Sequence, residues 1–302
     1  MLDRRDFLLG SAAVAAISLL RPAFAQTTTV SSIKRGFLER PGCRIYYEIT
    51  GSGPVIVFAH GLGSNHLTWW QQVAHFSSRF TCVTFAHRGY PPGSEIPGGP
   101  DPKDFAGDLA ALIEHLQLPD IRLVAQSMGG WTSVEYILSY PHKVRALVLT
   151  STCGTIQRAS VPLADPQRLA EWTRKAVPAR ADMQRRGISP PAGERMAREQ
   201  PALHFLYQAI ANASAAFDRE ELRKRLAAMA TRPPEVLRGF SMPTLFITGD
   251  EDTTYPPFLS DALAPLMPNA KVEHVREAGH SVYFERASVF NQLVDRFLVS
   301  LG

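Results

Sequence analysis

One serine in the sequence occupies a position where its hydroxyl could act as a nucleophile. The apolar run 121–125 leads directly into Gln126-Ser127-Met128-Gly129-Gly130, and a helical pattern follows. A turn this tight between a strand and a helix strains the serine backbone and pushes the hydroxyl beyond the end of the sheet. The neighbours two positions away must be small, and they are Ala125 and Gly129. By itself, the motif fits an ordinary turn serine equally well.

The surrounding pattern predicts an α/β fold with a mainly parallel sheet flanked by helices. Strand-like runs alternate with segments whose apolar residues recur at helical spacing, as in βαβ units. The expected strands are 44–48, 55–59, 81–86, 121–125, 145–149, 244–247 and 271–275, and the clearest helices are 104–116, 131–138 and 289–298. Residues 155–240 contain no strand-like run, so we expect several short helices inserted between two strands of the sheet.

At this point the sequence resembles the α/β-hydrolase superfamily, from about Ile33 to the C-terminus. The nucleophile turn of that family reads G-x-S-x-G, and this chain has Ala125 at the first position, which adds one methyl group. His60-Gly61-Leu62-Gly63 follows the run 55–59, where the family has an H-G-x-G oxyanion loop. The resemblance implies that the backbone N–H groups of Leu62 and Met128 form the oxyanion hole. Each such donor contributes about 3–4 kcal/mol to stabilising the transition state.

The same resemblance supplies a base and an acid. His280, in Ala278-Gly279-His280-Ser281, stands where the family has its G-H histidine, before the last helix. The segment Gly249-Asp250-Glu251-Asp252 matches the family pattern G-x-x-D, which implies that Asp252 orients the imidazole. Asp250 is the alternative, and Glu251 is less favoured. The order Ser127, Asp252, His280 is that of α/β-hydrolases. We expect His60 and His87 to be structural.

These residues favour a hydrolase that cleaves a carboxylic ester or lactone through an acyl-enzyme. A serine nucleophile argues against haloalkane dehalogenases and epoxide hydrolases, which use aspartate in the same turn. A C–C bond hydrolase and a cofactor-free haloperoxidase or perhydrolase remain alternatives, because both use the same machinery. A non-catalytic binding protein of this fold would be expected to have lost members of the triad, and none is missing. The mechanism requires no metal or cofactor.

The predicted insertion 155–240 corresponds to the helical cap of the family, which covers the substrate pocket. The fold itself would then comprise residues 26–154 and 241–302. Trp69, Trp131 and Trp172 are candidates for the pocket lining, although packing within the core or cap explains each of them as well. The insertion has 15 Lys+Arg and 9 Asp+Glu, a net charge of +6, against +4 for the whole chain. This suggests either substrates that carry a carboxylate or simply a solvated face.

The first 25 residues have the pattern of an export signal. Two arginines, Arg4-Arg5, precede Phe7-Leu8-Leu9, and an apolar stretch of 13 residues from Leu8 to Leu20 leads to Ala23-Phe24-Ala25. This resembles the twin-arginine pattern R-R-x-F-L, and an ordinary Sec signal is the alternative. We expect transport by the twin-arginine export machinery, cleavage after Ala25 and a periplasmic protein. No stable membrane anchor would remain after cleavage.

The composition excludes several other classes of protein. The 302 residues include 45% apolar side chains, 32 Lys+Arg and 28 Asp+Glu, which is incompatible with a disordered or collagen-like chain. No run of five or six like charges occurs, so a nucleic-acid partner is not expected. The three cysteines show no C-x-x-C spacing that would indicate a zinc or redox site. The expected partner is a small ester or lactone.

Overall fold

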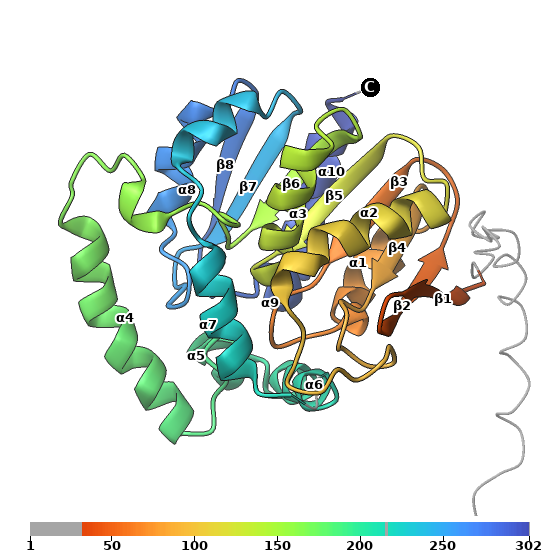
Figure 1. Ribbon diagram of the computed structural model, residues 1–302. Helices are drawn as coiled ribbons and strands as arrows, with labels where there is room; N and C mark the ends of the chain where they lie inside the picture. Colours follow the sequence, from red (N-terminus) through yellow and green to blue (C-terminus); the bar gives the residue numbers. More distant parts are fainter. Residues whose placement is uncertain (1–31, 215–216, 302) are drawn as a thin grey trace, which may run out of the picture. The chain divides into compact units, whose positions relative to one another are not determined.

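The computed structural model describes residues 32–214 and 217–301, so the expected export signal at 1–25 lies outside the described residues. A sheet of eight strands has helices on both faces, which confirms the predicted α/β architecture (Figure 1). The strands are β1 (Lys34–Arg40), β2 (Cys43–Thr50), β3 (Val55–Ala59), β4 (Thr81–Phe85), β5 (Ile121–Gln126), β6 (Val144–Thr150), β7 (Thr244–Gly249) and β8 (Ala270–Val275).

The sheet is parallel over most of its width and antiparallel at one edge. Its strand order is β1-β2-β4-β3-β5-β6-β7-β8. β1 pairs with β2 and β2 with β4 in antiparallel fashion, whereas all later pairs are parallel. The sequence pattern did not reveal β1, because this edge strand is largely exposed and lacks a continuous apolar run.

The central strands are buried on both faces because helices cover both sides of the sheet. In β3, every residue is buried, and the side chains of Val57 and Phe58 enter different apolar clusters. Successive side chains of a strand point to opposite faces, so a strand between two helical layers must be apolar at every position. This is the physical reason why these strands appear in the sequence as continuous apolar runs.

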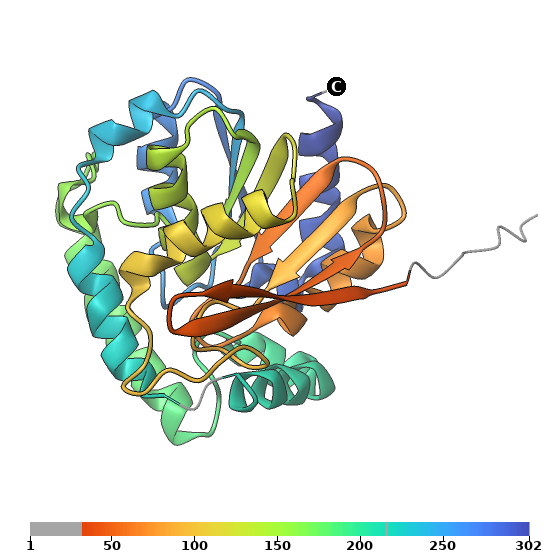
Figure 2. The ribbon, with the colours of Figure 1, turned by 45° about the vertical axis from the view of Figure 1, so that its right-hand side comes forward.

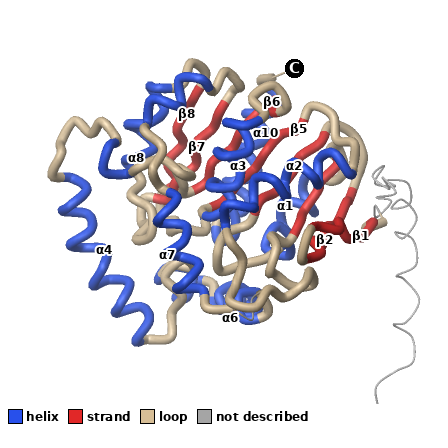
Figure 3. The backbone as a smooth tube through the Cα atoms, in the orientation of Figure 1, coloured by secondary structure: helices blue, strands red, loops and turns tan. Residues whose placement is uncertain are grey.

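Two groups of helices form the outer layers, as Figures 2 and 3 show. Apolar residues of α2 (Phe105–His115), α3 (Met128–Ser139) and α8 (Phe258–Leu263) pack on one face. Those of α1 (Trp70–Phe76), α9 (Val282–Glu285) and α10 (Ala287–Val299) pack on the other. Short 3-10 helices are η1 (His66–Trp69), η2 (Pro102–Asp104), η3 (Arg158–Ser160), η4 (Pro234–Gly239) and η5 (Ala264–Leu266).

Four further helices lie between β6 and β7 in the chain. They are α4 (Arg168–Arg185), α5 (Glu194–Glu199), α6 (Pro201–Asn212) and α7 (Arg219–Met229). In the view of Figure 1, α4 runs along the left of the molecule, and α5 and α6 lie below the sheet. We refer to residues 155–240 as the insertion. No helix in the described part of the chain is long and apolar enough to cross a bilayer.

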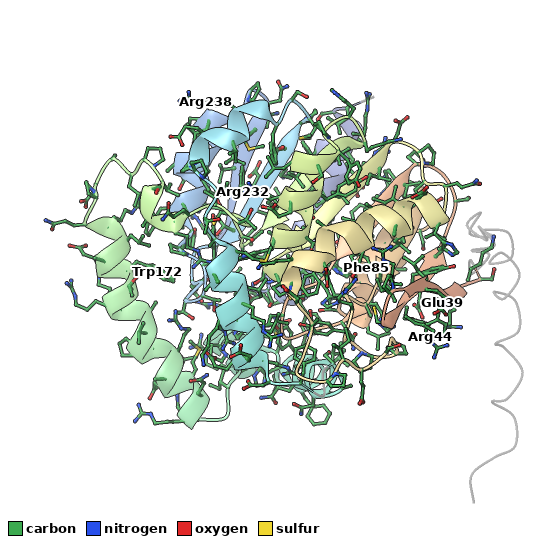
Figure 4. The ribbon with its side chains drawn as sticks, in the orientation of Figure 1. Glu39, Arg44, Phe85, Trp172, Arg232 and Arg238 are labelled. Carbon is green, nitrogen blue, oxygen red and sulfur yellow. The ribbon has the colours of Figure 1, made fainter. Side chains whose placement is uncertain are left out.

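The two ends of the insertion are joined to each other where they leave the sheet. Backbone hydrogen bonds link Arg232 N–H to the Thr155 carbonyl (3.0 Å) and Gln157 N–H to the Arg232 carbonyl (2.8 Å). The guanidinium of Arg232, labelled in Figure 4, pairs with Glu135 of α3 through its Nε (3.0 Å) and Nη2 (2.8 Å). The Thr155 hydroxyl donates to the same carboxylate at 2.6 Å. These contacts anchor the base of the insertion to α3.

Candidate active site

Ser127, between β5 and α3, has a strained backbone. Its φ of 49° and ψ of −115° lie in a region that residues with a side chain rarely adopt. The Ser127 N–H donates to the Thr150 carbonyl of β6 (3.1 Å), and its own carbonyl accepts from Gly130 N–H (2.8 Å). Ser127 is partly exposed, whereas Ala125–Gln126 and Met128–Trp131 are buried. The turn therefore presents this one residue outside the core, as the sequence predicted.

The turn is this sharp because α3 approaches β3 very closely. A Cβ placed on Gly129 would lie 2.2 Å from the carbonyl oxygen of Ala59, the last residue of β3. No side chain fits there without moving the strand or the helix. Glycine at this position is therefore a packing requirement of the fold, and it is also what permits the serine to sit at the apex.

His280 and Asp252 form a buried hydrogen-bonded pair. His280 Nδ1 lies 2.8 Å from Asp252 Oδ2, and both side chains are almost completely buried. The other carboxylate oxygen of Asp252 accepts the N–H groups of Thr254 (2.7 Å) and Tyr255 (2.9 Å). A carboxylate can only accept, so the proton must reside on His280 Nδ1, which leaves Nε2 free to accept a proton.

The rival acid, Asp250, is engaged elsewhere. Its carboxylate contacts Nδ1 of His274 at 3.1 Å on the exposed side of β8. Backbone contacts hold the loops that carry Asp252 and His280 together, since Glu251 N–H donates to the Ala278 carbonyl at 2.9 Å. A Cβ on Gly249 would come within 2.3 Å of carbonyls in the histidine loop. The geometry thus pairs Asp252 rather than Asp250 with His280.

Ser127, Asp252 and His280 all follow the carboxyl ends of parallel strands, namely β5, β7 and β8. This edge is where ligands bind in open α/β sheets. A direct link joins the serine turn to the histidine loop, because the Gln126 side-chain amide donates to the His280 carbonyl at 3.4 Å. The sequence did not indicate this contact, since a glutamine before a turn has no distinguishing pattern.

The two expected oxyanion donors lie on either side of Tyr90. Within the described residues, the backbone N–H groups of Leu62 and Met128 donate no hydrogen bond to the protein. Met128 begins α3, and the first N–H groups of a helix have no intrahelical acceptor. The buried hydroxyl of Tyr90 donates to the Leu62 carbonyl (2.9 Å) and also contacts Met128 Sδ (3.5 Å). Tyr90 therefore holds both residues, a contact that sequence reasoning missed.

Two buried histidines support the loop that carries Leu62, one of the two expected oxyanion donors, and they carry no charge. His60 Nδ1 bonds to the Gly61 carbonyl (2.8 Å), and His60 Nε2 accepts the backbone N–H of His87 (3.0 Å). The His87 ring contacts His60 Nε2 (3.0 Å) and the Thr132 hydroxyl (2.9 Å). Burial lowers the pKa of His60 to about 3 and lowers that of His87 well below its usual value. Both histidines act structurally, as expected from the sequence.

The insertion contacts the histidine loop directly. The Ser281 hydroxyl donates to the Tyr207 hydroxyl of α6 at 3.1 Å, and the Tyr207 ring packs edge-on against Phe284 at 5.1 Å. Burial raises the pKa of Tyr207 to about 12, so its hydroxyl remains protonated. On the core side, the Tyr283 hydroxyl bonds to that of Thr68 at 2.6 Å. The loop that carries His280 is therefore held from both sides.

The three tryptophans suggested as pocket residues occupy different environments. Trp69 has no exposed surface and stacks among aromatic rings of the core, including Tyr283 at 4.4 Å, so the prediction that it lines a pocket is wrong. Trp131 packs in the same apolar cluster as Leu62 and Met128, and its Nε1 donates to the Leu226 carbonyl of α7 at 2.9 Å. Trp172, on α4 in Figure 4, is partly buried and packs against the larger apolar cluster of the core.

A buried carboxylate lies just behind the histidine loop. Glu285 accepts the N–H of Gly279 through Oε1, whereas its buried Oε2 has no partner within the described residues. Burial raises the pKa of Glu285 to about 7. This effect outweighs the hydrogen bond from Gly279 N–H and the charge of Arg286, both of which lower the pKa. The Glu251 and Asp252 charges raise it further. Glu285 lines a cavity of about 400 Å³ between α4, α5 and the histidine loop, which none of Ser127, Asp252 and His280 lines.

No group of three or more metal-ligating side chains gathers anywhere in residues 32–214 and 217–301. The polar groups around Ser127 are instead single donors and acceptors, each from a different loop. Such an arrangement can support proton transfer between a serine hydroxyl and an imidazole, together with hydrogen bonding to a developing negative charge.

Glu285 generates a prediction about stability and pH. Its carboxyl keeps a proton up to about pH 7 in the folded protein, but loses it near its ordinary value of 4.5 when unfolded. Between these pH values the folded state binds more protons than the unfolded state. The free energy of unfolding therefore falls as the pH rises, by on the order of 3 kcal/mol at pH 8. Glu285→Gln keeps an acceptor for Gly279 N–H and should remove this dependence of the free energy of unfolding on pH.

Urea unfolding at several pH values from 5 to 8 would measure the slope of the free energy of unfolding against pH. The exposed Glu273→Gln on β8 serves as the matched control and should retain the wild-type slope. Identical slopes in wild type and Glu285→Gln would show that the folded pKa of Glu285 is not raised.

Comparison with known proteins agrees with this architecture. A family model described as the alpha/beta hydrolase fold matches residues 54–287. 3-Oxoadipate enol-lactonase 2 of Acinetobacter baylyi is 28% identical over 244 residues, covering 80% of this chain and 87% of that protein. A thermophilic esterase from Thermogutta terrifontis superimposes with a TM-score of 0.68 at 24% identity, covering 89% of this chain and 99% of the esterase.

A bromoperoxidase from Bacillus anthracis superimposes with a TM-score of 0.70 at 23% identity, covering 88% and 99% of the two chains. At such identities the structural matches indicate the fold alone. The family match spans most of the chain, from β3 to the first residue of α10. The protein therefore belongs to the α/β-hydrolase fold family.

Proposed function

We propose that the protein is a serine hydrolase that cleaves a carboxylic ester or lactone, with Ser127 as nucleophile, His280 as base and Asp252 as the acid that orients His280. The observation that carries this proposal is the buried 2.8 Å hydrogen bond between His280 Nδ1 and Asp252 Oδ2. It leaves His280 Nε2 as the free acceptor, in a loop bonded to the residue before the strained Ser127.

The reaction follows from these groups. His280 Nε2 accepts the hydroxyl proton as Ser127 Oγ attacks the substrate carbonyl carbon, and the resulting oxyanion binds the N–H groups of Leu62 and Met128. His280 then gives the proton to the leaving alcohol oxygen, which remains tethered when the substrate is a lactone. His280 then takes a proton from a water molecule whose oxygen attacks the acyl carbon, and it returns that proton to Ser127 Oγ as the bond to the acyl group breaks and the acid leaves. Asp252 stabilises the imidazolium during both steps.

The relatives support an ester or lactone as the substrate class. The name of the Acinetobacter baylyi protein specifies a lactonase, and the Thermogutta terrifontis structure is of an esterase. Both bonds contain an acyl carbon attached to an oxygen leaving group, which is the bond that a serine, a histidine and an oxyanion hole can break. Residues 155–240 would cover the pocket in this proposal, with Trp131 and the apolar residues around it beside the acyl group.

Substitutions in the triad test this proposal. Ser127→Ala should abolish hydrolysis of p-nitrophenyl esters and labelling by a fluorophosphonate while leaving thermal unfolding intact. Asp252→Asn should lower kcat about 10,000-fold, because the imidazole would lose the carboxylate that sets its tautomer. Asp250→Asn is the matched control, since it removes an exposed carboxylate two residues away and should change kcat less than about threefold. A larger loss in Asp250→Asn than in Asp252→Asn would refute the assignment.

A relative in Mycobacterium tuberculosis that is 28% identical over 270 residues, covering 84% of this chain and 97% of that protein, is named "Putative non-heme bromoperoxidase BpoC", which favours perhydrolysis as a second candidate function. Here hydrogen peroxide, rather than water, would attack the acyl-enzyme on Ser127 and release a peracid, which then oxidises bromide. Incubation with acetate, hydrogen peroxide and bromide should brominate a phenol dye in a Ser127-dependent manner. If peroxide merely competes with water at less than about a tenth of the ester hydrolysis rate, perhydrolysis is a side reaction.

We also propose that residues 1–25 direct export of the folded protein to the periplasm through the twin-arginine machinery. The support is the order of the arginine pair Arg4-Arg5, the apolar stretch and Ala23-Phe24-Ala25. The exported protein should begin at Gln26 by N-terminal sequencing, and replacing both arginines by lysine should retain it in the cytoplasm. Export of the lysine variant at the wild-type level would instead indicate a Sec signal.

A further inference from the structure

Three half-buried arginines of the insertion, Arg158, Arg180 and Arg219, form no ion pair with a carboxylate within the described residues. The other half-buried arginines of the insertion are paired. Arg195 bonds to Glu251 at 2.6 Å, and Arg225 lies 3.3 Å from Glu221. Because a guanidinium withdrawn from water without an anion is costly, the three unpaired ones need an explanation.

Arg180 reaches from α4 to the loop that carries the candidate acid. Its Nη1 donates to the carbonyl of Thr253, the residue after Asp252. Arg180 forms no ion pair with Asp252, whose oxygens bond to His280 and to two backbone N–H groups. Burial lowers the pKa of Arg180, and Arg158 is one of the cations that lower it further, against the opposing effect of Asp252.

Arg158 lies on the adjacent side of the same loop. Its guanidinium carbon is 5.6 Å from the ring centroid of Tyr255, whose backbone N–H caps Asp252. A cation over an aromatic ring gains some attraction, but not as much as a carboxylate would provide. Arg158 and Arg180 thus bring two positive charges to the acid side of the candidate site.

Arg219 lies on the opposite side, near the oxyanion loop. It begins α7, and its Nη2 donates to the Ala211 carbonyl. Two residues earlier, Phe217 packs edge-on against Tyr90 at 5.1 Å, so this end of α7 rests on the tyrosine that holds Leu62 and Met128. Burial raises the pKa of both Tyr90 and Tyr207, and in both the charge of Arg219 opposes this effect. The start of α7, which carries Arg219, therefore lies against the Tyr90 side of the site.

We propose that these arginines bind a carboxylate on the substrate, so that the protein acts on esters or lactones that carry a second, free acid group. This inference rests on the proposed function and specifies its substrate class. A guanidinium offers several donors in a planar arrangement that fits a carboxylate, and the bound anion would supply the missing counter-charge. The exposed arginines of the insertion that pair with acidic side chains contribute to its net charge but do not bind the substrate.

A matched series of esters tests the inference. Methyl butanoate, pentanoate and hexanoate are compared with the monomethyl esters of succinic, glutaric and adipic acid, which replace the terminal methyl by a carboxylate. The measured quantity is the ratio of kcat/KM for the acidic ester over its neutral partner. We expect a wild-type ratio of about 10 to 100 for the best chain length, since hydrogen bonds to charged groups discriminate to that extent.

Arg180→Gln and Arg219→Gln, made singly and together, should lower that ratio at least tenfold in the double variant, mainly through KM, and Arg180→Lys should restore part of it. Arg174→Gln is the matched control, because Arg174 is an exposed arginine of the same helix. It should leave the ratio unchanged. The wild-type ratio should persist at about 0.5 M salt, because partly buried pairs are screened less than exposed charges.

Binding without turnover gives an independent readout. Calorimetry with Ser127→Ala should detect the monomethyl ester preferred by the wild type and no binding of its neutral partner, and Arg180→Gln in that background should weaken the binding. A wild-type ratio near one, a ratio that salt abolishes or an equal loss in Arg174→Gln would overturn the inference while leaving the proposed function standing. Absence of Ser127-dependent hydrolysis of every ester would instead overturn the proposed function itself.

Discussion

The strained backbone of Ser127 is the constraint on which the rest of the site depends. Holding a serine at a φ of 49° costs on the order of 1–3 kcal/mol, and contacts elsewhere in the fold must offset this strain. The fold holds the turn from three directions, through the Thr150 carbonyl of β6, the first turn of α3 and the close approach of Gly129 to Ala59. Since β5 lies between β3 and β6, the order of the central strands itself creates the turn.

Contacts from the insertion stabilise each side of this turn separately. Trp131 bonds to the α7 backbone on the side of Leu62 and Met128, whereas Ser281 bonds to Tyr207 of α6 on the histidine side. The two ends of the insertion meet at Arg232, which is anchored to Glu135. Because the insertion is tied to the core at its base and over the site, its arginines have defined positions relative to Ser127. The composition gives the insertion its net positive charge, whereas packing and hydrogen bonds determine where those charges lie.

Histidine shows how environment determines chemistry in this protein. His60, His87 and His280 are all buried, yet the ring nitrogens of His60 and His87 are used in hydrogen bonds that hold neutral rings, and burial keeps both uncharged. His280 alone of the three faces a carboxylate, which fixes its proton on Nδ1. Nine histidines in the sequence are chemically identical, so only their position after particular strands distinguished the candidate base. The same reasoning separates Asp252 from Asp250.

The sequence by itself determined the central sheet and the positions of Ser127, Asp252 and His280, because continuous apolar runs mark strands buried on both faces and short polar motifs follow the ends of those strands. It did not reveal the edge strand β1, whose exposed residues follow no apolar pattern. Nor did it place Trp69, which packs into the core, or reveal Tyr90, Gln126 and Glu285, which act through contacts with residues distant in the chain. Local pattern reflects which face of an element is buried. Only the tertiary structure decides which side chains from separate elements meet, and therefore which charges find partners and which do not.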